Sequence, residues 1–266
     1  MKSKAILGQN FLVDKKIVKK IIELSQIGRN DVVYEVGTGK GTLTKELCKA
    51  SKFVYSFELD SYLFKQSKES LKFDNLKIFN LDGLNEKLNI QFDVFFSSLP
   101  YYESRKALSW LCQKQFKRGI ILLQREFVEK LISKPGDKNY RAISILSQYR
   151  FSIEILLKVS PSSFSPKPKV ESLLVELCPK TTPLSPQVIK DIQFLYSFRK
   201  KTVSSVFNYF NKHYKHDSFE STISDIASIR IANLSPNQLL WLNETLKNNL
   251  FYNEKTGAYP NGSRNI

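Results

Sequence analysis

The stretch from Val32 to Gly41, which reads VVYEVGTGKG, constrains the fold more than any other part of the chain. Its first half is an apolar, β-branched run typical of a buried strand. Its second half places glycine at alternate positions before a helical pattern that begins at Thr42. Glycines there let the backbone turn sharply and approach a bound molecule closely. The stretch therefore predicts the strand, loop and helix that open a βαβ nucleotide-binding unit.

Strand and helix patterns alternate after this loop. Apolar runs predict further strands at residues 52–60, 76–81, 92–97 and 119–124, and amphipathic segments predict helices at 42–50, 61–71 and 103–114. Two helical segments follow at 125–134 and 140–149, and two closing strands at 153–159 and 172–177. With the strand at residue 32, seven strands are expected. The pattern is typical of an α/β fold with a mostly parallel sheet and helices on both faces.

The C-terminal part of the chain follows a different pattern. A linker rich in Thr and Pro at residues 181–186 precedes only helical segments, the last of which is capped by Ser235 with Pro236 at its first position. We expect a Rossmann-like domain over residues 1–179 and a small helical domain over 180–251. Residues 252–266, rich in Asn, Gly and Ser, are expected to form a disordered tail.

Net charge narrows the class of partner. The chain holds 41 Lys and Arg against 25 Asp and Glu, which gives a formal charge of +16 over 266 residues. Such an excess favours a polyanionic partner, nucleic acid first, because phosphate neutralisation releases counterions. An anionic membrane surface and a general compositional bias are the alternatives.

Cysteine usage and hydropathy indicate a soluble, cytoplasmic protein. Cys48, Cys112 and Cys178 are far apart and form no CxxC pair, which disfavours a disulfide framework or a thiolate zinc site. No apolar run approaches the roughly 20 residues that cross a bilayer, and the N-terminus lacks a signal-peptide pattern. His213 and His216 have no carboxylate partner in register, so we expect no metal site. The sequence contains no heptad pattern that would indicate an oligomer, so we expect a monomer.

Carboxylates follow two of the predicted strands. Glu58 lies 21 residues beyond Gly37, about where a βαβ nucleotide site places a carboxylate that accepts both ribose hydroxyls. The alternative, a helix N-cap, suits Asp60 better than Glu58. Asp82 ends the third strand and can accept from an adenine amino group, although Asp-Gly is also a common turn.

The segment Ser98-Leu99-Pro100-Tyr101 follows the fourth predicted strand. Proline fixes the backbone and leaves carbonyls aimed outward, with a small hydroxyl before it and an aromatic ring after it. This constellation can hold an exocyclic amine and stack on its base, and a plain turn is the alternative. Phe164, in a proline-interrupted loop at 164–170, is a candidate lid over a base, with a rigid hairpin connection as the alternative.

The form of the glycine loop narrows the cofactor. The loop is GxGxG, and Thr42 stands where a dinucleotide fingerprint has its last glycine, so a pyrophosphate cofactor is disfavoured. No GxxxxGK[ST] segment occurs, which argues against an NTPase. A nucleoside cofactor without phosphates, bound by carboxylates, suggests S-adenosylmethionine.

Five segments in this order resemble the motifs of the rRNA adenine N6,N6-dimethyltransferase family, which holds the universal small-subunit enzymes and the Erm resistance enzymes. They are residues 9–12 (QNFL), 35–41 (EVGTGKG), 58–60 (ELD), 98–101 (SLPY) and 164–172 (FSPKPKVES). Residues 197–203 (SFRKKTV) and 230–235 (RIANLS) resemble helical segments of the small-subunit branch. The resemblance extends from about residue 8 to the final helix and is nearest to the archaeal members.

This resemblance implies a Rossmann-like S-adenosylmethionine-dependent methyltransferase with a C-terminal helical domain that contacts RNA. It also implies roles for individual residues. Ser98 and the Pro100 carbonyl would hold the target N6 amine, while Tyr101 and Phe164 would stack on the flipped adenine. The residues implied at the cofactor are Gln9, Asn10, Leu12, Gly37, Gly39, Glu58, Asp82 and Ser98.

One residue departs from the family pattern. The family usually has Asn where this chain has Ser98, and a hydroxyl reaches less far than an amide and offers different donors and acceptors. The leading hypothesis is dimethylation of two adjacent adenosines near the 3′ end of small-subunit rRNA during ribosome assembly. Weakened activity, or a single methylation, is an open alternative, as is an assembly factor that binds RNA on the same fold. A DNA adenine methyltransferase is disfavoured by the small size of the helical region.

Overall fold

The fold is that of a computed structural model, which describes residues 9–214 and 223–247. The chain divides into two compact units that are each discontinuous in sequence. The first comprises residues 1–129 and 150–183, and the second comprises residues 130–149 and 184–266. Residues 130–149 therefore group with the C-terminal helices, whereas the sequence analysis counted them in the N-terminal domain. The division into domains at residue 179 stays a prediction, and the expected tail at 252–266 lies outside the described residues.

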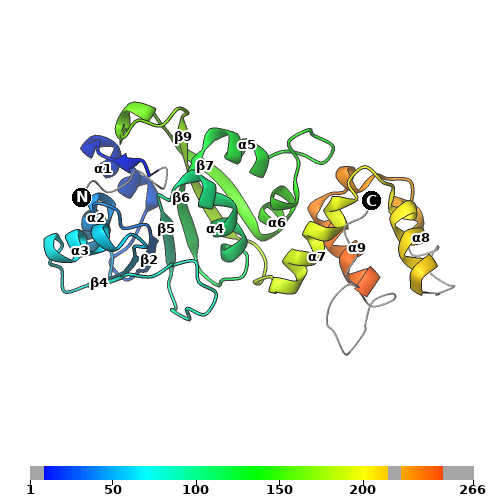
Figure 1. The fold of residues 1–266 in the computed structure, drawn as a ribbon, viewed down its shortest axis with the longest axis horizontal. Coiled ribbons are helices and arrows are strands. Elements are labelled where there is room, and N and C mark those ends of the chain that lie inside the picture. The colour runs from blue at the N-terminus through cyan, green and yellow to red at the C-terminus, as the bar shows by residue number, and fades with distance from the viewer. Residues whose placement is uncertain (1–8, 215–222, 248–266) are drawn as a thin grey trace. The chain divides into compact units, whose positions relative to one another are not determined.

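The first unit is built on a seven-stranded sheet with the order β4-β3-β2-β5-β6-β9-β7 (Figure 1). The first five of these strands run parallel, and β9 pairs antiparallel with both β6 and β7. This confirms the predicted seven-stranded, mostly parallel sheet. The strands are β2 (Val32–Val36), β3 (Phe53–Phe57), β4 (Leu76–Phe79), β5 (Val94–Ser97), β6 (Arg118–Gln124), β7 (Phe151–Val159) and β9 (Ser172–Pro179).

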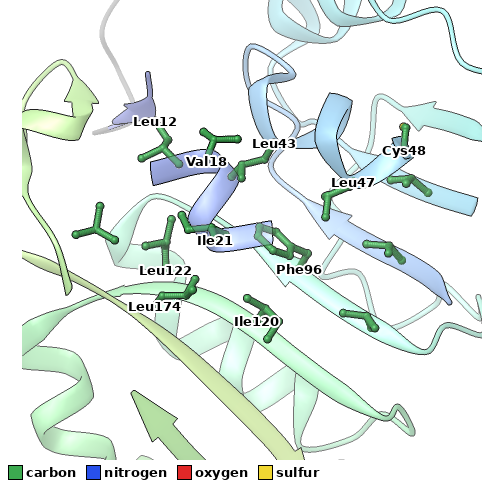
Figure 2. Close-up of a cluster of buried hydrophobic side chains, with 14 of the residues drawn as sticks. Leu12, Val18, Ile21, Leu43, Leu47, Cys48, Phe96, Ile120, Leu122 and Leu174 are labelled. Atoms are coloured by element: carbon green, nitrogen blue, oxygen red, sulfur yellow. The ribbon is translucent and has the colours of Figure 1, made fainter. Parts of the chain in front are cut away.

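Helices cover both faces of this sheet, as predicted. Alternation along β2 sends Val33 to one face and Tyr34 to the other. Val33 belongs to a buried cluster that also contains Val18 and Ile21 of α1 and Phe96 of β5, and Figure 2 shows Ile21 near Phe96. Tyr34 packs on the opposite face against Trp110 of α4, with ring centroids 5.4 Å apart. The helices of this unit are α1 (Lys15–Ser25), α2 (Thr42–Ala50), α3 (Ser61–Ser70), α4 (Ser104–Leu111) and α5 (Arg125–Leu131, except its last two residues).

The strand order places a ligand crevice between β2 and β5. From β2 the chain continues to β3 and β4 on one side, then returns to add β5 and β6 on the other. Ligands of open α/β sheets bind outside the carboxyl ends of the strands at such a reversal. Gly37 follows β2 and Ser98 follows β5, so both predicted motifs begin at this point of the sheet.

A second, two-stranded sheet was not expected from the sequence. Strand β1 (Phe11–Leu12) pairs antiparallel with β8 (Phe164–Ser165), so that Leu12 lies opposite Phe164. Val13 N–H also donates to the Ser163 carbonyl at 2.9 Å. Both strands have only two residues, too short for a periodic pattern to be recognised. The pairing brings the QNFL and FSPKPKV segments together, although about 150 residues separate them in the chain.

The second unit contains helices α6 (Ala142–Arg150, except its last residue), α7 (Pro186–Ser197), α8 (Val203–Tyr214) and α9 (Pro236–Leu246). Tyr140 ties it together, because its hydroxyl donates to the Leu234 carbonyl at 3.1 Å and its carbonyl accepts from the Tyr196 hydroxyl at 2.6 Å. Ser235 and Gln238 form a capping box at the start of α9, as the sequence signal at Ser235 predicts.

Most element boundaries agree with the sequence patterns to within two or three residues. Helix α1 is followed by Gln26 in a left-handed conformation, with φ 47°. Helix α4 begins at Ser104, one residue after its expected start, and a short 3₁₀ turn at Tyr101–Glu103 precedes it. Among the described residues, the structure contains no helix with the length and apolar character needed to cross a membrane.

Candidate active site

The loop after β2 takes the conformation that its glycines permit. Gly37, Gly39 and Gly41 all have positive φ, at 92°, 55° and 73°. A β-carbon on Gly41 would lie 2.7 Å from Leu71 Cδ1, and one on Gly39 would lie 3.2 Å from the Phe11 ring. Side chains at these two positions would therefore be strained by both the backbone and their neighbours. The loop is held close to α3 and to β1.

Hydrogen bonds hold this loop from two sides. Glu58 accepts the Gly39 N–H on Oε2 at 2.7 Å and the Asp60 N–H on Oε1 at 2.9 Å. On the other side, the Ser67 hydroxyl of α3 donates to the Gly39 carbonyl at 2.8 Å. Glu58 is only 4% exposed, and burial raises the pKa of its carboxyl, while the two N–H donors act in the opposite direction. The carboxylate predicted to bind ribose is therefore fixed by backbone donors.

A buried polar network lies beneath the loop. Glu35 Oε2 accepts from the Thr44 hydroxyl at 2.7 Å and from the Ser56 hydroxyl at 2.6 Å. Ser56 Oγ also lies 2.5 Å from Thr38 Oγ1, so the network reaches the loop itself. Burial raises the pKa of Glu35 to about 7, against the two hydroxyl hydrogen bonds, which lower it, and the nearby Glu58 charge adds to the rise. The network links β2, β3, α2 and the glycine loop.

Asp82, in the turn after β4, is held by a second set of contacts. Asp82 Oδ1 accepts the Leu84 N–H at 2.9 Å, and Oδ2 accepts from the Lys106 ammonium of α4 at 2.6 Å. Beneath the turn, the Tyr34 hydroxyl donates to the Gly83 carbonyl at 2.7 Å. A β-carbon on Gly83 would lie 2.7 Å from Phe57 Cβ, so the turn packs directly against Phe57. The ring of Phe57 stacks on that of Tyr34, and these rings form an aromatic layer on this face of the sheet.

The Ser98–Tyr101 segment lies against the glycine loop. A β-carbon on Gly37 would be 3.4 Å from Leu99 Cδ2 and 3.8 Å from the Ser98 carbonyl. The Pro100 carbonyl accepts the Glu103 N–H at 2.9 Å, and its second lone pair can accept another hydrogen bond. Tyr101 turns toward β9, since its hydroxyl lies 2.7 Å from Ser172 Oγ, and burial raises its pKa.

These segments enclose one pocket of about 1000 Å³, part of it open to solvent. Every residue that the sequence implied at the cofactor lines it, namely Gln9, Asn10, Leu12, Gly37, Gly39, Glu58, Asp82 and Ser98. Pro100 lines the pocket too. Tyr101 is not among the lining residues. The aromatic residues that line the pocket are Phe11, Phe57 and Tyr102, and Tyr102 is 59% exposed. The structure thus brings the residues implied at the cofactor together at one pocket.

Phe164 does not line the pocket. It is 6% exposed and belongs to the buried cluster that also contains Leu12 and Val159. The sequence analysis treated it as an exposed ring on a proline-interrupted loop. Its pairing opposite Leu12 in the two-stranded sheet explains why it is buried here. Its stacking role stays a prediction.

Sequence reasoning missed three features of this site. The Glu35 network carried a signal, because Glu35 interrupts an apolar strand and a buried acid requires partners. Tyr34 carried a weaker one, as a hydroxyl within a buried strand. Lys106 carried none, since the pairing of a lysine with a carboxylate 24 residues earlier depends on the tertiary fold.

A sheet of this order, with a glycine loop after β2, carboxylates after β3 and β4, and a Ser-Leu-Pro-Tyr turn after β5, defines an S-adenosylmethionine-dependent methyltransferase. The sequence profile of the ribosomal RNA adenine dimethylase family matches residues 1–247. The chain belongs to this family, as the resemblance of its motifs predicted.

Individual relatives agree with this assignment. A probable ribosomal RNA small subunit methyltransferase A from Methanococcus maripaludis is 37% identical over 225 residues, which cover 84% of this chain and 81% of that protein. A protein of the same name from Pyrococcus abyssi is 31% identical over 249 residues, 91% of each chain. Among solved structures, a dimethyladenosine transferase from Plasmodium falciparum matches with a TM-score of 0.77 and 25% identity, over 91% of this chain and 100% of that one.

Proposed function

We propose that this chain transfers methyl groups from S-adenosylmethionine to the N6 atoms of two adjacent adenosines near the 3′ end of small-subunit rRNA, during ribosome biogenesis. One observation carries the proposal: the Ser98–Pro100 turn opens into the same pocket as Gly37, Glu58 and Asp82. A target amine held at that turn would lie beside the cofactor. The relatives named as small-subunit rRNA methyltransferases support the choice of substrate.

The chemistry of the pocket fits this cofactor. Three carboxylates line the pocket against two lysines, and one of those lysines, Lys106, is already paired with Asp82. This balance suits a cationic sulfonium ligand better than a phosphate. Glu58 would accept from the ribose hydroxyls and Asp82 from the adenine amino group. The cofactor supplies an electrophilic methyl group, and Gly37 leaves room for it to approach the backbone.

At the target, Ser98 and Pro100 would act on the adenine amine. That amine is conjugated and weakly nucleophilic, and acceptors that draw its hydrogens out of the ring plane localise the lone pair on nitrogen. A new nitrogen–carbon bond forms while the sulfur–carbon electron pair returns to sulfur, and the extra proton on nitrogen leaves to solvent. Positioning and electrostatics then carry the rate, with no covalent enzyme intermediate.

The partner would be RNA, and the compartment the cytoplasm. The formal charge of +16 supports a polyanionic substrate, because each phosphate contact adds counterion release to the binding free energy. We expect the chain to act as a monomer that needs no metal.

The first experiment is transfer of labelled methyl from S-adenosylmethionine to under-methylated small ribosomal subunits, followed by nucleoside analysis. Dimethyladenosine supports the proposal in full. Monomethyladenosine alone supports the reaction and limits it to one step. No transfer, with a family enzyme active on the same subunits, overturns the catalytic proposal. Naked small-subunit rRNA and duplex DNA serve as control substrates.

Ser98 favours a second candidate function, a catalytically weakened assembly factor that binds RNA on this fold. A hydroxyl at this position reaches less far than the family's usual amide. The substitution Ser98→Asn separates the two functions. A gain in turnover, or in the second methylation, indicates an enzyme slowed at this position. No activity in either form, with binding to the small subunit intact, indicates the assembly factor.

A further inference from the structure

Strand β2 carries a buried tyrosine, Tyr34, whose hydroxyl is not part of the Glu35 network. The other residues of β2 apart from Glu35 are valines. Tyr34 is 1% exposed, and its ring packs between those of Phe57 at 4.5 Å and Phe92 at 4.9 Å, centroid to centroid. Close packing on both sides fixes the ring and therefore the direction of its hydroxyl. That hydroxyl donates to the Gly83 carbonyl at 2.7 Å and does not reach the pocket.

The acceptor of this bond belongs to the turn that carries Asp82. Within the turn, Asp82 Oδ1 accepts the Leu84 N–H at 2.9 Å, and the Asp82 carbonyl accepts the Asn85 N–H at 3.1 Å. These bonds set the shape of the turn but do not tie it to the sheet. The Tyr34 hydroxyl does so from below, at the peptide group that joins Gly83 to Leu84.

We propose that Tyr34 is a positioning residue for the adenine end of the cofactor site, acting through Gly83 to hold the Asp82 carboxylate where an adenine amino group donates to it. The inference rests on the proposed function, since it takes Asp82 as the adenine acceptor. Tyr34 itself touches no ligand. Removing its hydroxyl leaves the Gly83 carbonyl buried without this partner and frees the turn to shift.

The prediction is a loss of selectivity for the adenine amine rather than a general loss of binding. S-adenosylhomocysteine carries the amine, and S-inosylhomocysteine has a carbonyl in its place. We expect the wild type to prefer the adenine compound and Tyr34→Phe to lower that preference about five- to thirty-fold. At saturating cofactor the turnover number should change little, while KM for the cofactor rises.

The experiment measures both dissociation constants by calorimetry for the wild type, Tyr34→Phe, Asp82→Asn and Tyr55→Phe. Tyr55 is the register partner of Tyr34 on β3, and no hydrogen bond of its hydroxyl occurs within the described residues. It is therefore the matched control, and its variant should keep the full preference. Hydrogen exchange at the Leu84 and Asn85 amides supplies a second readout, which should be faster in Tyr34→Phe than in Tyr55→Phe.

The outcomes separate this inference from the proposed function. If Asp82→Asn loses the preference and Tyr34→Phe keeps it, with unchanged exchange at the turn, Tyr34 is structural only and the inference is wrong. If Asp82→Asn keeps the preference, Asp82 is not the adenine acceptor and the inference falls with that assignment. If the wild type binds neither compound, the cofactor of the proposed function is wrong. Loss of preference in both variants, but not in Tyr55→Phe, supports the inference.

Discussion

The two carboxylates at the strand tips are held in opposite ways. Glu58, on the glycine-loop side, is 4% exposed, and both of its oxygens accept backbone N–H groups. Asp82, on the other side of the pocket, has a side chain that is 38% exposed and pairs with Lys106, which is 50% exposed. The first carboxylate is held by two backbone N–H groups. The second is held by one backbone N–H, that of Leu84, and by the Lys106 ammonium of α4, on a turn whose Gly83 carbonyl accepts from the Tyr34 hydroxyl of β2.

This difference determines how each side should respond to substitution. Hydrogen bonds from backbone N–H groups to a buried carboxylate are charge-assisted and unscreened, so loss of the acceptor is costly. An exposed ion pair contributes about 0–1 kcal/mol and weakens with salt. The Asp82 turn nevertheless has one rigid point, Gly83, which rests on the aromatic layer. Substitutions can therefore separate the rigid from the adjustable parts of the site.

The largest effect is expected for Gly83→Ala. The added β-carbon would meet Phe57 Cβ at 2.7 Å and Val36 Cγ2 at 3.0 Å, and neither atom is the end of a flexible side chain. Overpacking of this kind costs about 1–3 kcal/mol of unfolding free energy, and a displaced turn should weaken cofactor binding more than tenfold. Urea unfolding and cofactor titration measure the two effects.

Gly28→Ala is the control for that substitution, because a β-carbon there would have its nearest neighbour at 3.5 Å, an ordinary contact. It should stay within about 0.5 kcal/mol of the wild type. Equal stability of the two alanine variants would contradict tight packing of the Gly83 turn against the sheet.

Glu58→Gln is expected to have the next largest effect. One of the two backbone N–H groups would then face an amide NH₂ instead of an acceptor, because both carboxylate oxygens are in use. We expect cofactor affinity to fall about 10- to 100-fold, through the loosened loop and the lost ribose acceptor. Asp60→Asn keeps the cap of α3 and should bind normally. Normal binding by Glu58→Gln would show that the backbone bonds do not fix this side.

The two sides also differ in how far the sequence predicts them. The glycine loop, Glu58 and Ser98 follow strands whose apolar patterns are unambiguous, so their meeting at one sheet edge was foreseeable. The supports of these residues were not. The bond from Tyr34 to Gly83 and the pair of Lys106 with Asp82 join residues 49 and 24 positions apart, and no local periodicity encodes such contacts.

Phe164 is a second case in which local sequence does not predict the surroundings of a residue. Its proline-rich surroundings indicate an exposed loop, yet β8 pairs with β1 and buries the ring beside Leu12. Two-residue strands carry too few side chains for a pattern. The grouping of residues 130–149 with the C-terminal helices likewise depends on long-range contacts such as that of the Tyr140 hydroxyl with the Leu234 carbonyl.

A smaller effect is expected for Glu35→Gln, seen as a change in pH dependence. The folded state raises the pKa of Glu35 from 4.5 to about 7, so it retains a proton that the unfolded chain loses in this window. This contribution to stability is complete below about pH 4.5 and is lost as the pH rises to about 7. The stability of the wild type relative to Glu35→Gln should therefore fall between these limits, by at most about 1.4 kcal/mol per pH unit. Parallel stability profiles from pH 4.5 to 8 would contradict a protonated Glu35 beneath the loop.

The smallest effect is expected for Lys106→Met, which keeps the length of the side chain and removes its charge. Asp82 Oδ1 would still accept the Leu84 N–H, and the Tyr34 hydroxyl would still hold the turn, so the carboxylate keeps its place. Cofactor affinity should change less than fivefold, and the difference from the wild type should vanish near 1 M salt, where exposed charges are screened. Lys49→Met, which removes a similar exposed pair with Glu46 away from the pocket, controls for the change in net charge. A tenfold loss that persists in high salt, absent from Lys49→Met, would mean that Lys106 fixes Asp82 as firmly as backbone donors fix Glu58, and the contrast between the two sides would no longer hold.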